Sequence, residues 1–465
     1  MALARFIRSC EAISARLLTL DPEIVAPLCT DWTRRVTGEA LGLVRPSNEF
    51  ELAAVVEAAA DAGVHLHLQG GNTSLVAGAT PWGDSVLLST ARLRAVGEPD
   101  LTSQCITAEA GATAAEVNSA LAPHRLKLGV DLASRESATI GGMVATNAGG
   151  IHVVRYGSMR TQLLGVRLVT PAHGAIGRLS PLYKDNTGPD LAAIAAGSEG
   201  TLGVVAAAAL KAVPILDEGV VALLSFGSFP AAAEGARRIR RSPVVSALEF
   251  MTHSGMDLVS RHLGRALPLA GAVYLLVEFE SAFPLLDHVA EVVEDSAPST
   301  SALAFDTRGR AELWRWREAH TEAIAAAGVA HKMDVALPIS ALEEFVAWVE
   351  GPFAADNPEL DVYLFGHLGD GNVHVNLVGA EPDDFSPDEA VLAKAASMGG
   401  SISAEHGIGR LKASLVHLVR SPAEIEAMTA LKAAFDPDGI LNPGVLLPTP
   451  KGRHASENLA PGRLA

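Results

Sequence analysis

The pattern of hydrophobic and polar positions changes repeatedly over the first 214 residues, between the spacing of amphipathic helices and the short apolar runs of buried strands. Glycine-dense loops separate these segments, and Pro214 follows the last apolar run, which makes it a plausible domain boundary. We expect helices at 51–63 and 113–124, strands at 64–69 and 85–90, and glycine-rich loops at 69–81, 139–150 and 197–205.

From about residue 216 the segments become longer and predict a β-α-β-β-α-β order, which is typical of a split sheet with helices on one face. The expected strands are 219–227, 244–251, 272–280 and 301–305, and the expected helices are 230–241 and 284–295. Further helices are expected at 309–327, 340–350, 387–398 and 422–434, and the N-terminal stretch MALARFIRSCEAISARLL (1–18) is expected to be a first helix rather than a signal segment.

Composition and charge argue against several classes of function. The 465-residue chain has a formal net charge of −17, which disfavours nucleic acid or anionic membrane as a partner, and no run of 18 apolar residues predicts a transmembrane segment. Three scattered cysteines fit a reducing compartment, so we expect a cytoplasmic protein. An anionic substrate would need a local basic pocket in so acidic a chain.

The three glycine-rich loops are candidates for holding a diphosphate, because successive backbone N–H groups and hydroxyls can surround an anion where no Cβ intervenes. A single such loop is more often a tight turn. Three within 140 residues, each beside a strand, favour the ligand interpretation. None has the spacing of a Rossmann fingerprint or a P-loop.

The stretch FGHLGDGNVHVNL (365–377) predicts a β-hairpin, with Asp370-Gly371 as a two-residue type I′ turn. That turn pairs His367 directly with His374 on one face, and Phe365 with Asn376 next to them. The two imidazoles could share one divalent ion, or they could be ordinary half-buried strand histidines. A third ligand is available in SAEHGIGR, where Glu405 precedes His406.

Arg317 and Thr321 lie four residues apart on one face of the 309–327 helix, and Lys332 follows on a predicted strand. A guanidinium, a hydroxyl and an ammonium group could together hold a carboxylate. The alternative is an amphipathic helix with an arginine on its solvated side.

Several long motifs resemble one family: QGGNTSLVAGATP, DLASRESATIGGMVATNAGGIHVVRYGSM, KDNTGPDL and GSEGTLGVV. They are similar to the FAD-binding domain of vanillyl-alcohol-oxidase (PCMH) type, and most similar to its D-2-hydroxyacid dehydrogenase branch, from about Asp31 to Pro448. The resemblance implies an α+β fold. It comprises a PCMH-type FAD-binding domain (1–214), a ferredoxin-like substrate and metal-binding cap (215–420), a C-terminal segment returning to the FAD domain (421–448) and a disordered tail (449–465).

The same resemblance implies the cofactor site. FAD would be non-covalent, because Asn72 stands where relatives that tether the flavin carry histidine. The implied cofactor-binding positions are Gly70, Gly71, Asn72, Thr73, Ser74, Thr139, Gly141, Gly142, Ala145, Asn147, Gly149, Gly150, Gly200, Gly203, Val204 and Asn442.

For the reaction, the resemblance implies that His367, His374 and Glu405 bind a metal ion and that His406 is the catalytic base; the ligand preferences of zinc make it the expected ion. Arg317, Thr321 and Lys332 would bind the substrate carboxylate, and Asn376 is assigned to the substrate with them. We expect oxidation of a D-2-hydroxy acid by hydride transfer to FAD.

The substrate and the acceptor stay open in the sequence. QGGNT and KDNTG favour a D-2-hydroxyglutarate-like substrate over D-lactate or glycolate. A non-catalytic FAD-binding subunit of a larger complex is the rival class, and the four-residue histidine and glutamate set argues against it. The electron acceptor could be an electron-transfer flavoprotein, a quinone, a second oxo acid or oxygen.

Overall fold

The computed structural model describes residues 1–448, so the expected tail at 449–465 lies outside the described residues. The chain divides into two compact units: unit 1 comprises 1–149, 158–214 and the chain from Glu405 on, and unit 2 comprises 150–157 and 215–404. One segment of unit 1 ends at Pro214, the long segment of unit 2 ends at Ala404, and a short insert at 150–157 belongs to unit 2.

Hydrogen bonds show why the insert at 150–157 and the chain after Ala404 belong to their respective units. The Arg155 side chain donates to the carbonyl oxygens of Val244 (3.3 Å) and Glu280 (2.9 Å), which attaches the insert to the strands of unit 2. The Arg410 N–H donates to the Val76 carbonyl (3.1 Å), which attaches the chain after Ala404 to unit 1.

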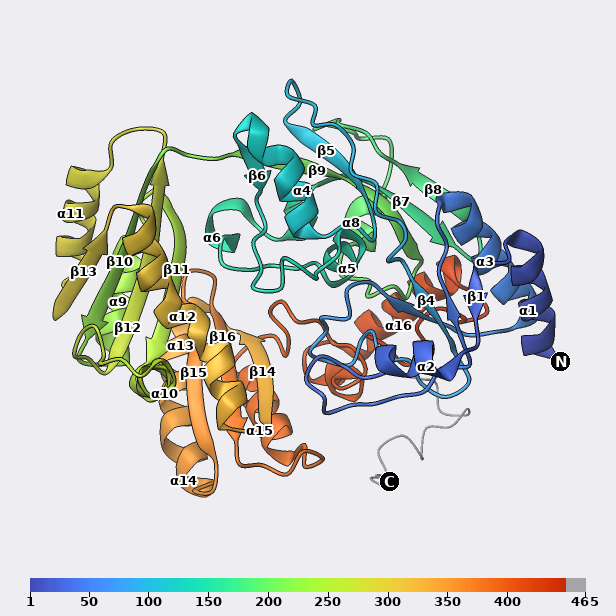
Figure 1. Cartoon of the computed structure of the whole chain (residues 1–465). Helices are drawn as coiled ribbons and strands as arrows, with labels where there is room; N and C mark the ends of the chain where they lie inside the picture. The colour runs from blue at the N-terminus through green and yellow to red at the C-terminus, as the bar shows by residue number, and fades with distance from the viewer. Residues whose placement is uncertain (449–465) are drawn as a thin grey trace. The chain divides into compact units, whose positions relative to one another are not determined.

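Unit 1 alternates short strands and helices, as the pattern predicted (Figure 1). Its helices are α1 (Ala2–Ile13), α2 (Pro22–Val25), η1 (Ala26–Leu28), α3 (Glu49–Ala62), α4 (Ala114–Leu121), η2 (Ala122–His124), α5 (Ile140–Thr146), α7 (Met159–Gln162), α8 (Leu191–Ala195), η5 (Ala413–Leu418) and α16 (Pro422–Phe435). Its strands are β1 (Leu18–Thr19), β2 (Leu43–Val44), β3 (Leu66–Gln69), β4 (Val86–Ser89), β5 (Cys105–Glu109), β6 (Leu126–Leu128), β7 (Leu163–Thr170), β8 (Gly174–Arg178) and β9 (Val204–Pro214).

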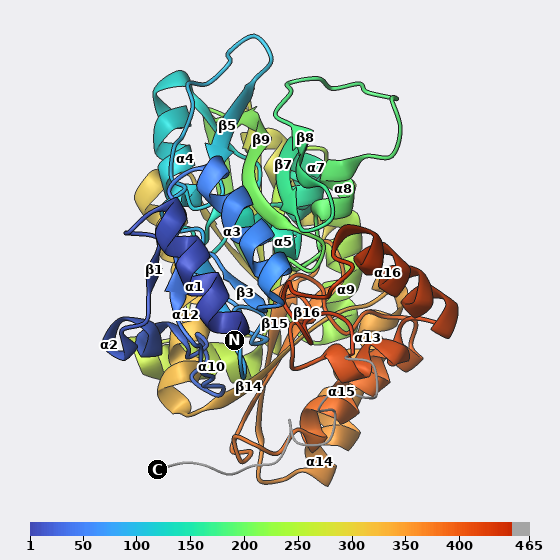
Figure 2. The ribbon, with the colours of Figure 1, turned by 90° about the vertical axis from the view of Figure 1, so that its right-hand side faces the viewer.

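These strands form two sheets. The first has the order β1-β2-β4-β3 with parallel pairs around β4, and the second has the order β5-β9-β7-β8 with antiparallel pairs. Helix α3 packs beside α1, as Figure 2 shows, and both contribute to a core that includes Phe6, Leu52 and Leu66. Asn48 caps the start of α3 and Gly63, with a φ of 67°, ends it, which matches the expected end of this helix.

Unit 2 consists of longer elements. Its helices are α6 (Val153–Tyr156), α9 (Phe229–Ile239), α10 (His253–Leu263), α11 (Leu286–Asp295), α12 (Thr307–Ala327), η3 (Ile339–Ala341), α13 (Leu342–Trp348), η4 (Val349–Phe353), α14 (Ala354–Asp356) and α15 (Ser386–Ser397). Its strands are β10 (Glu218–Phe226), β11 (Val245–Thr252), β12 (Val273–Ser281), β13 (Thr300–Ala304), β14 (Ala330–Ala336), β15 (Asp361–His367) and β16 (Asn372–Val378).

The seven strands form one antiparallel sheet in the order β13-β10-β12-β11-β15-β16-β14. The first four strands of this order, with α9 and α11, are the expected ferredoxin-like β-α-β-β-α-β arrangement, and the α+β class is confirmed. Helix α10, between β11 and β12, was not predicted. It packs beside α12 over one face of the sheet, where Met251, Met256, Trp316 and Phe365 share a core.

The predicted hairpin turn was wrong. β15 and β16 pair with Phe365 opposite His374 and Tyr363 opposite Asn376, so four residues connect the strands. A type I′ turn needs positive φ at both central residues, and here Gly371 has a φ of 87° while Asp370 is not among the positive-φ residues. Because the register moves by two positions, His367 and His374 stay on the same face, as diagonal rather than direct neighbours.

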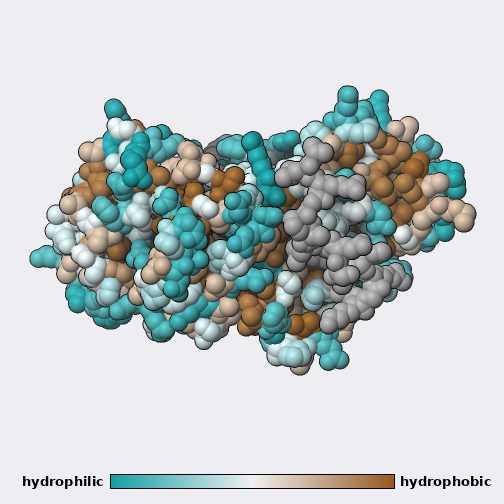
Figure 3. Space-filling model, turned by 90° about the horizontal axis from the view of Figure 1, so that it is seen from below, coloured by the Kyte–Doolittle hydropathy of each residue, from teal (hydrophilic) through white to brown (hydrophobic). Residues whose placement is uncertain are grey.

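Within the described residues, no helix is both long and apolar enough to cross a membrane. The face drawn in Figure 3 intermingles hydrophilic and hydrophobic residues. The large hydrophobic side chains exposed over the described surface, such as Phe50 (89%) and Phe283 (75%), come from distant parts of the chain.

Candidate functional site

Two of the predicted metal ligands and two of the predicted substrate-binding residues lie on one face of the unit 2 sheet. Cross-strand partners share a face, so the pairings Glu249–His367, His374–Asp334 and Asn376–Lys332 place all six side chains together. They come from four adjacent strands, β11, β15, β16 and β14. The same face carries the apolar core beneath α12, so the polar residues adjoin a dry surface.

The two histidines predicted to bind a metal are both buried, with 6% of His367 and 8% of His374 exposed. Their ring centroids are 5.3 Å apart and the rings are nearly perpendicular. Each ring has a carboxylate directly opposite on the neighbouring strand. His367 Nδ1 is 2.6 Å from Glu249 Oε1, and His374 Nδ1 is 3.5 Å from Asp334 Oδ1.

Glu249 is fully buried, and its second oxygen accepts a hydrogen bond from Nε of Arg317 at 2.8 Å. Burial alone would raise the pKa of the Glu249 carboxyl, but the His367 and Arg317 side chains together hold that pKa below its ordinary value. Arg317 is itself 8% exposed, and its guanidinium carbon lies 4.4 Å from the centre of the Phe365 ring.

Asp334 is fully buried as well, and both of its oxygens accept hydrogen bonds. The donors are the side-chain amide of Asn372 (2.5 Å) and the N–H of Ala404 (3.0 Å). Ala404 precedes Glu405 directly, so the peptide chain itself carries Glu405 and His406 to this carboxylate.

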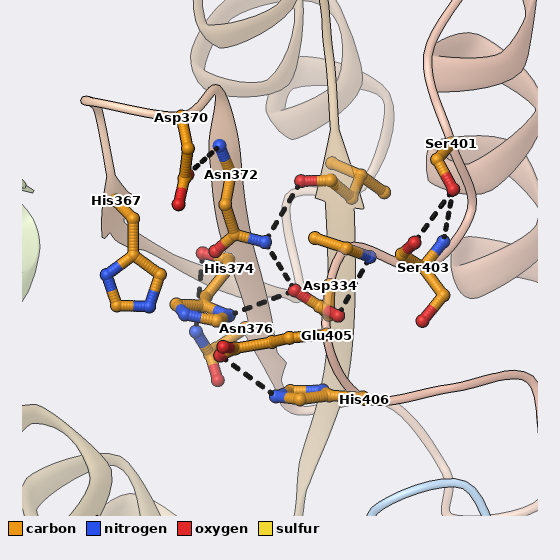
Figure 4. Close-up of polar contacts among 12 residues, drawn as sticks. Asp334, His367, Asp370, Asn372, His374, Asn376, Ser401, Ser403, Glu405 and His406 are labelled. Atoms are coloured by element: carbon orange, nitrogen blue, oxygen red, sulfur yellow. Dashed lines mark hydrogen bonds and ion pairs between the residues drawn. The ribbon is translucent and has the colours of Figure 1, made fainter. Parts of the chain in front are cut away.

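One group of side chains can hold a metal ion. Asp334, His374, Glu405 and His406 each offer one ligand atom, and the four atoms lie within 4.8 Å of one another. Figure 4 shows the side chains of His374, Asp334, Glu405 and His406 gathered at one place, with His367 to one side. This group contains two of the three predicted ligands, His374 and Glu405, and adds Asp334 and His406. Imidazole and carboxylate donors of this kind suit a divalent transition-metal ion.

The predicted carboxylate-binding residues lie in the same unit. Arg317 and Thr321 are on α12, one turn apart, and Lys332 is on β14 opposite Asn376. Burial lowers the pKa of the Lys332 ammonium group. The Asn376 side chain is buried and donates to the Tyr363 carbonyl (3.3 Å). The structure therefore supplies two basic side chains to one face of an acidic protein.

In unit 1, the first two glycine-rich segments pack against each other. A Cβ on Gly71 would lie 1.8 Å from the Ser137 carbonyl oxygen, and a Cβ on Gly70 would lie 2.3 Å from the Thr139 hydroxyl. Thr139 caps α5, and Asn72, with a φ of 52°, donates its side-chain amide to the Thr30 carbonyl (3.0 Å). Only glycine allows this approach of the two backbones, as a dinucleotide site built from main-chain groups requires.

The third glycine-rich segment contacts Asn442 of the C-terminal segment. The Asn442 side chain donates to the Glu199 carbonyl (2.7 Å) and accepts from the Leu68 N–H (2.7 Å). Gly200 has a φ of 72°, and a Cβ there would lie 2.8 Å from the Asn442 amide nitrogen. These hydrogen bonds attach the chain around Asn442 to β3 and to the Glu199–Gly200 turn of unit 1.

The other predicted cofactor positions are distributed along the same segments. Ala145 accepts the Glu199 N–H (2.8 Å), and Asn147 ends α5 in the left-handed region. Val204 begins β9 and Gly203 precedes it, where a Cβ would lie 2.7 Å from Leu168. Thr73 and Ser74 lie in the first loop, whereas Gly141 and Gly142 lie in helix α5, within the segment that the sequence predicted to be a loop. Gly149 is the last residue of its unit 1 segment, and Gly150 begins the unit 2 insert.

Sequence reasoning missed three buried carboxylates: Glu249, Asp334 and Glu199. Glu199 is 8% exposed and accepts the N–H groups of Ile408 (2.8 Å) and Gly409 (2.7 Å), directly after His406. Each was a lone acidic residue within an apolar or glycine-rich run, such as SALEFM around Glu249 and HKMDVALP around Asp334. An acidic residue in a buried strand signals a paired charge.

Comparison with known proteins identifies the class. Residues 40–180 match the family described as "FAD binding domain", and residues 216–446 match "FAD linked oxidases, C-terminal domain". A D-2-hydroxyglutarate dehydrogenase of Bos taurus is 34% identical over 94% of this chain and 82% of its own length. One from Xanthomonas citri pv. viticola is 34% identical over 94% of this chain and 96% of its own length.

Solved structures agree on the fold. An alkyldihydroxyacetonephosphate synthase has a TM-score of 0.75 at 18% identity, covering 95% of this chain and 84% of that chain. A 4-ethylphenol oxidase from Gulosibacter chungangensis has a TM-score of 0.75 at 16% identity, covering 97% of both chains.

An FAD-binding domain joined to an FAD-linked oxidase domain defines a flavoenzyme, and FAD is its cofactor. Within that class, the chain belongs to the FAD-linked D-2-hydroxyacid dehydrogenase family. The expected enzyme class, an FAD-dependent dehydrogenase, is confirmed.

Proposed function

We propose that the enzyme oxidises a D-2-hydroxy acid to the 2-oxo acid, with a D-2-hydroxyglutarate-like compound as the favoured substrate. The observation that carries this proposal is the shared sheet face, where buried Arg317 and the Lys332 ammonium adjoin the histidine and carboxylate group. The names of relatives that are 34% identical over most of the chain support the same substrate class.

The residues of the chain have separate tasks in this reaction. Arg317, Thr321 and Lys332 bind and orient the substrate carboxylate, and Asn376 lies beside them on the sheet face. His406 accepts the proton of the 2-hydroxyl group, a task suited to an imidazole near neutral pH. When bound, FAD supplies the acceptor for the hydride from the substrate carbon.

We propose His367, His374 and Glu405 as the ligands of a divalent metal ion, with zinc as the preferred ion. The support is the donor chemistry of these side chains and the proximity of His374 and Glu405 within the four-residue group. The ion would supply Lewis acidity toward the substrate hydroxyl. Elemental analysis of the purified protein tests both the presence of the ion and its identity.

We propose that FAD is held without a covalent bond. The Gly70–Ser74 loop, the Thr139–Asn147 segment and Gly200 fit a cofactor held by main-chain groups, because their close packing leaves no room for side chains at the glycines. Asn72 already donates to the Thr30 carbonyl and offers no nucleophile to the flavin. Release of free FAD into the supernatant after acid precipitation would support this arrangement, and a flavin that stays with the precipitate would contradict it.

The decisive test is reduction of the bound flavin by single D- and L-2-hydroxy acids, followed by absorbance without added acceptor. We expect bleaching by the D-enantiomer of a 2-hydroxy diacid. His406→Ala should keep FAD and lose reduction. Equal reduction by this variant and the wild type would overturn the role of His406, and reduction by no 2-hydroxy acid would overturn the proposed activity.

D-lactate is the second candidate substrate. A Schizosaccharomyces pombe relative, provisionally named a D-lactate dehydrogenase, is 31% identical over 91% of this chain and 85% of its own length. A panel of D-2-hydroxyglutarate, D-lactate and glycolate with a dye acceptor distinguishes the candidates by kcat/KM. The electron-transfer flavoprotein or quinone acceptor and the cytoplasmic location stay predictions.

A further inference from the structure

Glu249 contacts a residue of each part of the proposed substrate and metal site, Arg317 and His367. It lies in the middle of the apolar strand β11, directly opposite His367, and is fully buried. Isolated carboxylates are rarely retained in such a strand, because desolvation of the charge is unfavourable unless cationic or hydrogen-bonding partners offset it.

The two oxygens of Glu249 have different partners. Oε1 is 2.6 Å from Nδ1 of His367, and Oε2 is 2.8 Å from Nε of Arg317. A carboxylate only accepts, so Nδ1 of His367 donates and its Nε2 is left as the acceptor that can bind a cation. Arg317 donates through Nε, which leaves its two terminal nitrogens for a bidentate contact with a substrate carboxylate.

We propose that Glu249 is a positioning residue that sets the His367 tautomer for metal binding and the Arg317 orientation for substrate binding at the same time. This inference rests on the proposed function. The Arg317 guanidinium carbon lies over the Phe365 ring, 4.4 Å from its centre, and the hydrogen bond to Glu249 adds a second constraint on the guanidinium.

Asp334 offers a matched comparison within the same sheet. It is directly opposite His374, as Glu249 is opposite His367, and it is equally buried. Its partners include His374, Asn372 and Ala404. Both carboxylates therefore support a histidine, and Glu249 in addition accepts a hydrogen bond from the Arg317 guanidinium.

The experiment compares Glu249→Gln with Asp334→Asn in the FAD-loaded protein. Zinc affinity is measured by competition with a chelator, and binding of a 2-oxo acid is measured by perturbation of the flavin spectrum. We expect both variants to lose about 10- to 100-fold in zinc affinity, as loss of a carboxylate behind a metal-binding histidine generally does. We expect Glu249→Gln to weaken 2-oxo acid binding even after excess zinc has been restored.

A steady-state measurement separates the two effects further. With saturating zinc, Glu249→Gln should keep a raised KM, because zinc does not restore the hydrogen bond to Arg317. Glu249→Asp retains the charge but is shorter by one methylene, so its zinc affinity and KM should fall between those of the wild type and Glu249→Gln. If Glu249→Gln does not fold, Glu249→Asp still tests the inference.

Two outcomes would overturn the inference: zinc affinity of Glu249→Gln equal to that of the wild type, or full recovery of its KM with zinc. A fall in melting temperature and FAD content, with unchanged zinc affinity and KM in the folded fraction, would show a purely structural role and also overturn it. A wild type that neither binds zinc nor is reduced by a 2-hydroxy acid would instead overturn the proposed function itself.

Discussion

Each unit contains a buried carboxylate beside proposed functional residues, and the two carboxylates differ in their partners. Glu249 of unit 2 accepts from the side chains of Arg317 and His367. Glu199 of unit 1 accepts from the backbone N–H groups of Ile408 and Gly409. Burial raises the pKa of Glu199, and those N–H groups and Lys412 offset this only in part, whereas the pKa of Glu249 is held low.

The difference shows that hydrogen bonds and charge compensation are separate requirements. Backbone donors satisfy both oxygens of Glu199 but add no full charge, so its ionised form stays disfavoured relative to water. Glu249 has a cation in direct contact. We infer that Glu199 serves to shape the loop after His406, while Glu249 serves to hold charged side chains in place.

Removal of the cation from Glu249 should have the largest effect. Arg317→Met leaves a buried carboxylate without its charged partner, and breaking a buried ion pair in this way generally destabilises by about 3–5 kcal/mol. Denaturant unfolding is followed by tryptophan fluorescence, to which Trp314 and Trp316 of the same helix contribute.

Arg315→Met is the matched control, because Arg315 is exposed on that helix. It should change the unfolding midpoint little. If the two variants unfold at the same denaturant concentration, Arg317 does not compensate the charge of Glu249.

Replacement of Glu199 should have a smaller effect. Glu199→Gln keeps one acceptor oxygen but turns an amide NH₂ toward one of the two N–H groups, and a buried donor left unsatisfied destabilises by about 1–3 kcal/mol. Hydrogen exchange at Ile408 and Gly409 should become faster, and kcat should fall while FAD content stays the same. Glu136→Gln, at an exposed position of unit 1, is the control. Unchanged exchange at both amides would exclude the anchoring role.

The loop itself gives a third, smaller test. Gly407 has a φ of 83°, and a Cβ there would lie 3.1 Å from the carboxyl carbon of Glu199. Gly407→Ala should destabilise by about 1–2 kcal/mol from the left-handed backbone alone, with an added effect from the contact. Gly399→Ala shares the positive φ (76°) but meets nothing within 4 Å, so it measures the backbone part. Equal melting temperatures of the two variants would show that the Glu199 contact adds nothing.

Local sequence patterns predicted much of the fold. The ferredoxin-like order and the ends of α3, α15 and α16 follow from periodicity, glycine and capping residues. The hairpin register was mispredicted because Asp-Gly was given positive φ at both positions and only Gly371 adopts it. Helix α10 was missed because its short polar sequence lies between two strongly apolar strands.

Site residues could be predicted only where they belong to a short continuous motif. His367, His374, Glu405 and His406 come from two short motifs, and two carboxylates that support them come from strands far away in the sequence. Glu249 and His367 are cross-strand partners 118 residues apart. Such pairings depend on strand order in the sheet, and one sequence does not contain that information locally.

The smallest expected effect is a pH dependence of stability, which tests the direction of the pKa shift of Glu199. Because the folded-state pKa of Glu199 lies above its ordinary value of 4.5, the folded protein holds this proton more tightly than the unfolded chain. Wild-type stability relative to Glu199→Gln should therefore rise as the pH falls from neutral toward 4.5, by less than about 1.4 kcal/mol per pH unit. Other buried groups act in the opposite direction, since burial and then Arg317 lower the pKa of His320 to about 3, but both proteins share that group and it cancels in the difference. A stability difference that becomes smaller at lower pH would mean that the N–H groups of Ile408 and Gly409 and the charge of Lys412 lower the pKa of Glu199 more than burial raises it. The two carboxylates would then have pKa shifts in the same direction.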